Sequence, residues 1–460
     1  MNAPETAASL TPPTPARSGE APGWRLLRYA LAIGLALALT FLLGLAIAGW
    51  SLTVRSAVLP LLTGWSRPPE APLAAGLMAF LLLTPMVLLA LLLRLRRGVW
   101  AVLGGGWVVV IPTFVWLAWD DTEVRLPVTC EELAPPFPEA EKSYAVLMRY
   151  SERSSGQQAK GFASPDKLSP WTGNPDKGEA WRADIVKNRT TLEADWALLA
   201  PGRQWWAELN AFEQIGDLTP PNLKADFISF QVWYSMAQRC CAIAGLQALD
   251  GQGDAAVATL LPALQLGRKL QPASRTLIRT LIGRAVEKMA MQTASFILDH
   301  ATLSASAWAQ LTAALAGDDG AAGARRLVLM EPVFWAPISV QMRLGDIVTP
   351  QQPKRSSLAH KWLNLLSPFL YNTRASTNLR LELLSRLAKL AEARALKPVG
   401  TLGDALKADL RRQHGMKNLA GRKIVQQALF SFEKAAQSYW ETQDMRVALR
   451  ERLAALPPQP

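Results

Sequence analysis

The sequence predicts an all-α protein in which three transmembrane helices precede a mainly helical extracytoplasmic domain. Half of the 460 residues are hydrophobic and only 19% are charged, whereas about a quarter are charged in typical soluble domains. The scarcity of charge is concentrated before residue 120, and after it apolar residues recur at helical spacing. No stretch alternates polar and apolar residues over the length of a strand, so we expect no sheet.

The N-terminal quarter divides into a tail and a membrane domain. Residues 1–28 are rich in Pro, Ala and Thr and poor in large apolar side chains, which predicts a disordered cytoplasmic tail. Residues 29–119 form the membrane domain. It holds three apolar runs without a charged residue, at 29–50, 72–93 and 99–119. Because roughly twenty apolar residues in a helix cross a ~30 Å hydrocarbon core, each run predicts one span.

Arginines predict the orientation of these spans. They gather before the first span and between the second and third, as Arg17, Arg25, Arg28, Arg94, Arg96 and Arg97. Basic residues are retained on the cytoplasmic side, so the N-terminus is expected there and the chain from Asp120 onward outside. We therefore expect a multi-pass protein of the inner (plasma) membrane, with a periplasmic domain if the cell is Gram-negative. An alternative is cleavage after Ala48, which follows a signal-like small-x-small pattern and leaves the later topology unchanged.

Residues 120–178 are expected to form a linker and a long loop. Prolines make 126–138 extended, a short helix follows over 139–153, and 154–178 lacks any periodicity. Loops of that length are usually functional or mobile.

Residues 179–453 are expected to form the helical extracytoplasmic domain. Its clearest part is 226–300, where three apolar helical segments are separated by a Gly-bearing turn and by Pro272. Asp254 is the expected N-cap of the second segment. Within that segment, Leu260 and Leu264 should face the core and Arg268 should lie on the outer side.

The segment at about 251–270, with the helix before it, resembles the helical hairpin of tetratricopeptide repeats. Small and apolar residues stand roughly where the second helix of that repeat places them, at Ala256, Val257, Leu260, Ala263, Leu264 and Leu266. The resemblance covers one hairpin, and no second copy of the repeat follows. It implies stacked helices and a binding surface.

The rest of the domain is also expected to be helical. The apolar stretch 327–342 is interrupted by Pro332 and Pro337, which favours core packing over a membrane span, with a segment lying on the membrane surface as the alternative. Further helices are predicted from about Thr377, over 402–413 and over 422–453.

All three cysteines fall in the part of the chain expected outside the cytoplasm. A disulfide is allowed in such a compartment, and Cys130 can pair with Cys240 or with Cys241. The alternative is that the three are small buried hydrophobic residues. A metal site is not expected, because the sequence has no CxxC motif and its three histidines are isolated from one another.

The formal net charge of +12 comes mainly from the C-terminal half and suggests a basic contact face. Its candidate residues are Arg380, Arg386, Lys389, Arg411, Arg412, Arg422 and Lys423. Such a face can be merely solvated, or it can bind anionic lipid headgroups or an acidic envelope polymer. Nucleic acid is not expected as a partner outside the cell.

Recognisable catalytic and cofactor motifs are missing. The sequence contains no GxSxG, HExxH, P-loop or dinucleotide fingerprint, so catalytic residues stay unknown and no cofactor is expected. Four carboxylates on the tryptophan-bearing segments offer an acid/base pair or a solvated helix face: Glu179, Glu193, Asp195 and Glu208. The preferred hypothesis is a membrane-anchored helical interaction or scaffold protein of the cell envelope. The alternative is an envelope enzyme acting on a lipid or glycan.

The orientation is tested with alkaline phosphatase, which is active only outside the cytoplasm. A fusion after Asp121 should be active and a fusion after Arg97 should be inactive, because the arginines hold the second link inside. The reverse pattern of activity would contradict the orientation.

Overall fold

The computed structural model describes residues 121–149, 168–221, 231–317, 320–342, 371–396 and 418–455. All of them belong to one compact unit made of Asp120–Pro353 and Leu370–Pro460. This unit is all-α, and the described residues contain no strand. None of the described helices is both long enough and apolar enough to cross a membrane. The tail 1–28 and the predicted spans 29–50, 72–93 and 99–119 lie outside the described residues.

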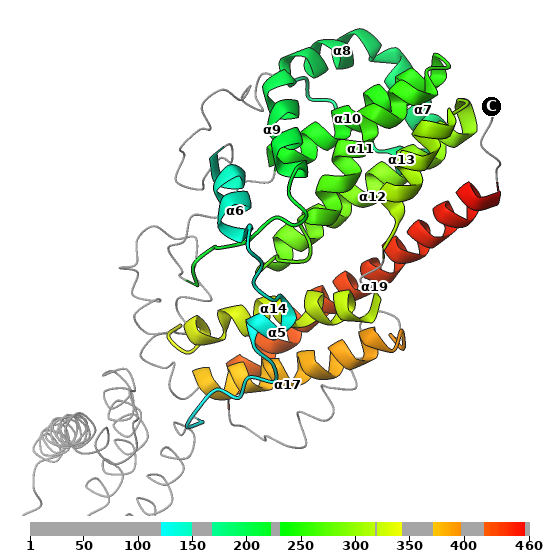
Figure 1. The fold of residues 1–460 in the computed structure, drawn as a ribbon. Helices are drawn as coiled ribbons and strands as arrows, with labels where there is room; N and C mark the ends of the chain where they lie inside the picture. The colour runs from blue at the N-terminus through cyan, green and yellow to red at the C-terminus, as the bar shows by residue number, and fades with distance from the viewer. Residues whose placement is uncertain are drawn as a thin grey trace, which may run out of the picture. The chain divides into compact units, whose positions relative to one another are not determined.

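Three helices form the centre of the unit, as the sequence predicts. They are α10 (Gln231–Leu249), α11 (Gly253–Lys269) and α12 (Leu277–His300), and each packs against the other two. Figure 1 shows them side by side, with the short α10–α11 and α11–α12 connections at opposite ends. Leu260 and Leu264 are fully buried between them, which confirms the predicted core face of α11.

Short helices cover this centre. The chain runs through α6 (Ala140–Arg149), the 3-10 turn η2 (Pro175–Lys177), α7 (Glu179–Lys187), α8 (Arg189–Leu198) and α9 (Ala200–Asn210), and α13 (Ala305–Leu315) follows α12. Tryptophans fill the contacts, because their large rings supply much apolar area. Trp181 meets Phe296 of α12 edge to face at 5.1 Å, and Trp205 meets Trp233 of α10 at 5.0 Å.

A second layer consists of α5 (Cys130–Leu133), α14 (Gly320–Ser339) and α17 (Thr373–Glu392), with the first half of α19 (Leu419–Ala455). It has its own apolar core, in which α14 and α17 pack along each other. Pro332 and Pro337 both lie inside α14, and Pro332 is buried. Each proline removes one backbone donor, yet the helix continues because its sides are held by this core. The prediction of core packing for this stretch is confirmed.

The long helix α19 connects the two layers. Val425, Leu429 and Phe432 belong to the second core, whereas Leu449 and Leu453 belong to the first. Figure 1 shows α19 running obliquely from the layer of α14 and α17 past α12. One helix therefore contributes apolar side chains to both cores.

A pair of glycines sets the closest approach in the central bundle. A Cβ at Gly267 of α11 would lie 2.7 Å from the Gly283 carbonyl oxygen and 2.8 Å from the Glu287 nitrogen of α12. A Cβ at Gly283 would in turn lie 2.8 Å from the Gly267 oxygen. These distances are too short for any side chain, so both positions require glycine.

Several local predictions need correction. Asp254 is not the N-cap: α11 begins at Gly253 after Gln252, and the Asp254 carboxylate instead accepts a hydrogen bond from the Ser304 backbone N–H at 2.9 Å. The linker 126–138 contains the one-turn helix α5, capped by the Thr129 side chain. Part of the expected long loop is ordered, since Leu168 is buried in the central core. The helix predicted over 402–413 lies outside the described residues.

Gly267→Ala tests the crossing of α11 and α12. Helix propensity alone predicts a gain of about 1 kcal/mol in the free energy of unfolding. Because the added methyl meets backbone atoms, we expect instead a loss of about 1–3 kcal/mol, measured by denaturant titration of the purified full chain. Ala258→Gly, at an exposed position of the same helix, should lose about 1 kcal/mol by propensity alone. A stabilised Gly267→Ala protein would contradict the close crossing.

A glutamine-lined cavity as the candidate binding site

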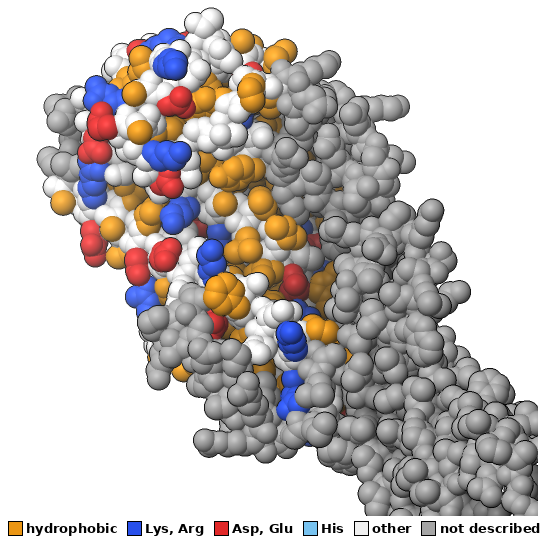
Figure 2. Space-filling view, turned by 180° about the vertical axis from the view of Figure 1, so that it is seen from behind, with side chains coloured by type: hydrophobic (Ala, Val, Ile, Leu, Met, Phe, Trp, Pro, Cys, Tyr) orange, Lys and Arg blue, Asp and Glu red, His pale blue; other side chains and the backbone are white. Residues whose placement is uncertain are grey.

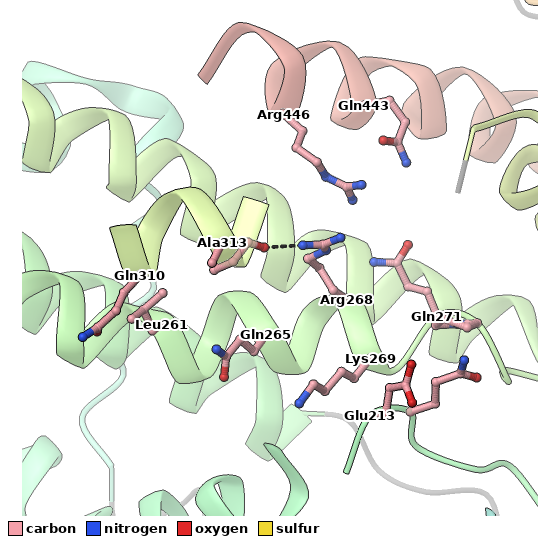
Figure 3. Close-up of a pocket in the computed structure, with 13 residues that line it drawn as sticks. Glu213, Leu261, Gln265, Arg268, Lys269, Gln271, Gln310, Ala313, Gln443 and Arg446 are labelled. Atoms are coloured by element: carbon pink, nitrogen blue, oxygen red, sulfur yellow. Dashed lines mark hydrogen bonds between the residues drawn. The ribbon is translucent and has the colours of Figure 1, made fainter. Parts of the chain in front are cut away.

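The candidate site is a cavity of about 670 Å³ where α11, α13, α19 and the segment after α9 meet. Figure 3 shows side chains from these elements pointing into one space. Its lining consists of Glu213, Gln214, Leu261, Gln265, Arg268, Lys269, Gln271, Pro272, Gln310, Ala313, Ala314, Gln443 and Arg446. The size lies within the usual range of ligand sites, about 300–1,000 Å³.

Helical spacing brings these side chains together. Residues three and four apart share one face of a helix, and α11 presents Leu261, Gln265 and Arg268 in this way. Gln443 and Arg446 have the same relation on α19. The buried apolar residues of α11, such as Leu260 and Leu264, face α10 and α12. Gln265 and Arg268 lie beside them and face the cavity.

Polar residues outnumber apolar residues in the described lining. Five of the lining residues are glutamines and three are cations, against one carboxylate and four apolar residues. Pockets for small molecules are mostly apolar and aromatic, and no aromatic ring is among the described residues of this lining. Its chemistry is that of amide groups, each of which can donate and accept hydrogen bonds.

A buried carboxylate lies beneath the cavity. Glu287 of α12 is completely buried and forms an ion pair with Arg446 of α19. Gln271 donates a 2.8 Å hydrogen bond to its other oxygen, and the Arg268 guanidinium lies 4.0 Å away. A buried charge is tolerated only when paired and hydrogen-bonded. Glu287 therefore determines where the two arginines and Gln271 of the lining must stand.

Arg268 also closes the end of α13. Its guanidinium donates to the carbonyl of Ala314 and, at 2.5 Å, to that of Ala316. The last carbonyls of a helix lack partners within the helix, and a cation is favourable at that end. The prediction that Arg268 lies on the free outer side of α11 is therefore wrong, since its side chain joins α11 to α13.

Gln265 and Gln443 of the lining, like Gln214, make no hydrogen bond to another described residue. Gln443 is nevertheless only 3% exposed. Buried polar groups normally have partners. The amides of Gln265 and Gln443 face the cavity and are available to a ligand.

Lys269 supplies the remaining cation. Its ammonium donates to the Asn210 carbonyl at 2.5 Å. Burial lowers the pKa of Lys269 from its usual value, and the nearby Glu213 carboxylate opposes that shift. An ammonium has three donors, so two remain for another acceptor.

The lining offers hydrogen-bond donors, acceptors and cations that could hold a ligand. Among its described residues there is no Ser, Thr, Cys, His or Tyr, and Glu213 is the one carboxylate. A nucleophile next to a base, or two acids in different environments, is what covalent or acid/base catalysis needs. Across the described residues, no cluster of side chains has the composition of a metal site.

No protein-family model matches the chain, and the comparisons with curated proteins and with solved structures find no match.

The cysteines lie away from this cavity and are not bridged in the structure. Cys240 and Cys241 are buried in the central core, whereas Cys130 is half-buried beside the second core. Burial raises the pKa of the Cys241 thiol to about 12, and that of Cys240 also lies well above its usual value. Of the two alternatives drawn from the sequence, the structure has small buried residues at 240 and 241 and no bridge to Cys130.

Five of the seven residues of the predicted basic face are described, and they lie in different surroundings. Arg380 is directed toward α14 and α19, 3.9 Å from Glu331 and 5.8 Å from the Phe432 ring, and burial lowers its pKa. Arg386 pairs with Glu382 at 2.6 Å.

The other members are scattered. Arg422 lines a second cavity beside α17, and burial lowers its pKa. Lys389 and Lys423 are exposed, and 411 and 412 lie outside the described residues. Figure 2 shows Lys, Arg, Asp and Glu side chains interspersed on the visible described face. On this face, carboxylates therefore lie between the basic side chains.

Three of the four carboxylates noted in the sequence lie in different surroundings, and the fourth, Glu208, is half-buried on α9. Glu179 and Glu193 are exposed, as a solvated face requires. Asp195 is buried and pairs with Arg239 at 3.2 Å, and it accepts a 2.5 Å hydrogen bond from the Ser169 hydroxyl. This pair anchors the ordered end of the long loop to α8 and α10, and it is not part of the cavity.

Glu287→Gln tests the role of the carboxylate under the cavity. Removing one member of a buried pair leaves a charge uncompensated and costs about 3–5 kcal/mol. We expect that loss in the free energy of unfolding of the full chain. The double variant Glu287→Leu with Arg446→Met should recover most of it, because apolar replacement of a buried pair is often neutral. Equal losses in the single and double variants would contradict a direct pair.

Proposed function

We propose that the protein is a membrane-anchored helical binding protein of the cell envelope, and that its cavity holds a polar segment of a protein partner. The observation that carries this proposal is the amide-rich lining, which offers many donors and acceptors but no nucleophile with a base. Such a lining can hold a ligand in a defined orientation without reacting with it. An interaction or scaffold role follows from this chemistry.

The membrane part of the proposal rests on the sequence. Three uncharged apolar runs precede Asp120, and the arginines between them favour a cytoplasmic N-terminus and an extracytoplasmic C-terminal domain. The first described residues, which follow directly on the third run, are firmly attached. Asn378 of α17 donates to the Asp121 carboxylate at 2.6 Å and accepts from the Arg125 backbone N–H at 2.8 Å. A domain fixed so close to the last span would be presented at the membrane.

The helical hairpin supports a binding role. In the resemblance to tetratricopeptide repeats, stacked helices provide a surface for a partner. Here α10 and α11 pack as a hairpin, α12 and α13 extend the stack, and the cavity opens on the polar side of α11. We propose that these stacked helices likewise provide a surface for a partner, although the chain has only one such hairpin.

Site-specific photo-crosslinking in intact cells tests the proposal. A photoreactive residue at Gln310, an exposed position on the rim, should give one discrete protein adduct. The same residue at Gln427, exposed on α19 but absent from the lining, should give none. Adducts of equal yield from both positions, or no protein adduct from Gln310, would contradict a binding role for the cavity.

A further inference from the structure

The three cations of the lining differ in how many acceptors within the protein they already contact. Arg446 is held by Glu287 and by the Gly317 carbonyl, and Arg268 by Glu287 and the end of α13. Lys269 has one acceptor, the Asn210 carbonyl. The positive charge that can turn toward a ligand is therefore that of Lys269, with the amides of Gln265 and Gln443 opposite or beside it (Figure 3).

We propose that the cavity binds an acidic, extended peptide segment of the partner, with a carboxylate on Lys269 and peptide groups on Gln265 and Gln443. This inference rests on the proposed function and adds the chemistry of the segment. A peptide group presents one donor and one acceptor, which match the carbonyl and the NH₂ of a glutamine side chain. An extended strand exposes these groups repeatedly, so that Gln265 and Gln443 can each pair with a different peptide group.

The charge of the site selects an acidic segment. Among the described residues, the lining carries three cations and one carboxylate, and the buried Glu287 balances one more cation. One positive charge is left over among these described groups. A carboxylate that accepts from an ammonium makes a charge-assisted hydrogen bond, roughly twice as strong as a neutral one. The partial burial of Lys269 strengthens this further, because the local dielectric is low.

The same lining disfavours other anionic ligands. Its described residues include no aromatic ring against which a sugar ring or a nucleobase could stack, and the apolar ones among them are Leu261, Pro272, Ala313 and Ala314. A lipid chain would leave the amides of Gln265 and Gln443 without partners, which is unfavourable for a buried polar group. The peptide satisfies both the amides and the cation.

Glu213 provides a test of the sign of the ligand. It is exposed at the rim on the side of Lys269, and its charge acts on Lys269. It should repel an acidic segment and attract a basic one. Glu213→Gln should therefore tighten binding of an acidic peptide about two- to fivefold, the usual size of a surface charge effect.

The experiment is a titration of the detergent-purified full chain against fluorescent peptides, read by anisotropy. The probes are short peptides of fixed length on an Ala/Ser background that carry an increasing number of Glu residues, their Gln counterparts, and oligogalacturonate as an anionic glycan. We expect the affinity to rise with the number of carboxylates. Lys269→Met should weaken it at least about tenfold and Gln443→Leu about two- to tenfold, with Lys269→Arg restoring most of it.

Matched controls separate these effects from general charge or folding. Lys434→Met and Gln427→Leu, exposed on α19 and absent from the lining, should leave the affinity unchanged. Thermal unfolding should show each variant folded. Binding that ignores the number of carboxylates, that is weakened by Glu213→Gln, or that prefers oligogalacturonate would overturn the inference.

The outcomes also distinguish this inference from the function beneath it. A protein adduct at Gln310, together with peptide binding that does not depend on carboxylates, leaves the binding function in place and removes the acidic segment. No protein adduct at Gln310 removes both.

Discussion

The ion pair between Glu287 and Arg446 is the interaction on which the rest of the structure depends. It joins the middle of α12 to the second half of α19, and it is completely enclosed at the carboxylate. The Gly267–Gly283 crossing brings α11 close enough for Arg268 and Gln271 to reach the same carboxylate. The Glu287 carboxylate of α12 thus has partners from α11, from the residues that follow it, and from α19. It needs them because it has no access to water.

This arrangement explains why a polar cavity persists inside a helical bundle. Along the second half of α19, Arg446 pairs with Glu287 of α12, and the guanidinium of Arg284 lies 4.0 Å from the centre of the Tyr439 ring. Arg452 holds the end of the same helix through Ser295 and Asp299. The space left between α19, α11 and α13 is lined by the glutamines. The proposed function therefore follows from the same packing that stabilises the domain.

Sequence patterns predicted the parts of the fold that depend on local periodicity. The apolar residues of 226–300 gave the three central helices and their buried face, and α17 and α19 begin within a few residues of the predicted positions. The one interaction between distant segments offered from the sequence, a disulfide of Cys130 with Cys240 or Cys241, is not present in the structure. Asp254, Arg268 and Arg380 were each assigned from their own helix, whereas their partners are Ser304, the end of α13 and Glu331.

The candidate site was missed for a similar reason. Glutamine is common on solvated helices, so Gln265 and Gln443 carry no local sign of facing a shared cavity. One signal was present: Glu287 follows Gly283 by one turn on the face of α12 that carries Val286, Ala290 and Met291. A carboxylate there needs a cation from elsewhere, but the sequence does not say which of its 49 basic residues supplies it.

The most direct test of the central claim is hydrogen exchange of the full-length Arg446→Leu variant, measured by mass spectrometry. If the pair with Glu287 holds α19 in place, the amides of residues 440–455 should exchange faster than in the unmodified protein, because local opening then costs less. The amides of α10 should keep their protection. Unchanged protection over 440–455 would show that the apolar contacts of Leu449 and Leu453 hold the helix without the pair, and would contradict the account.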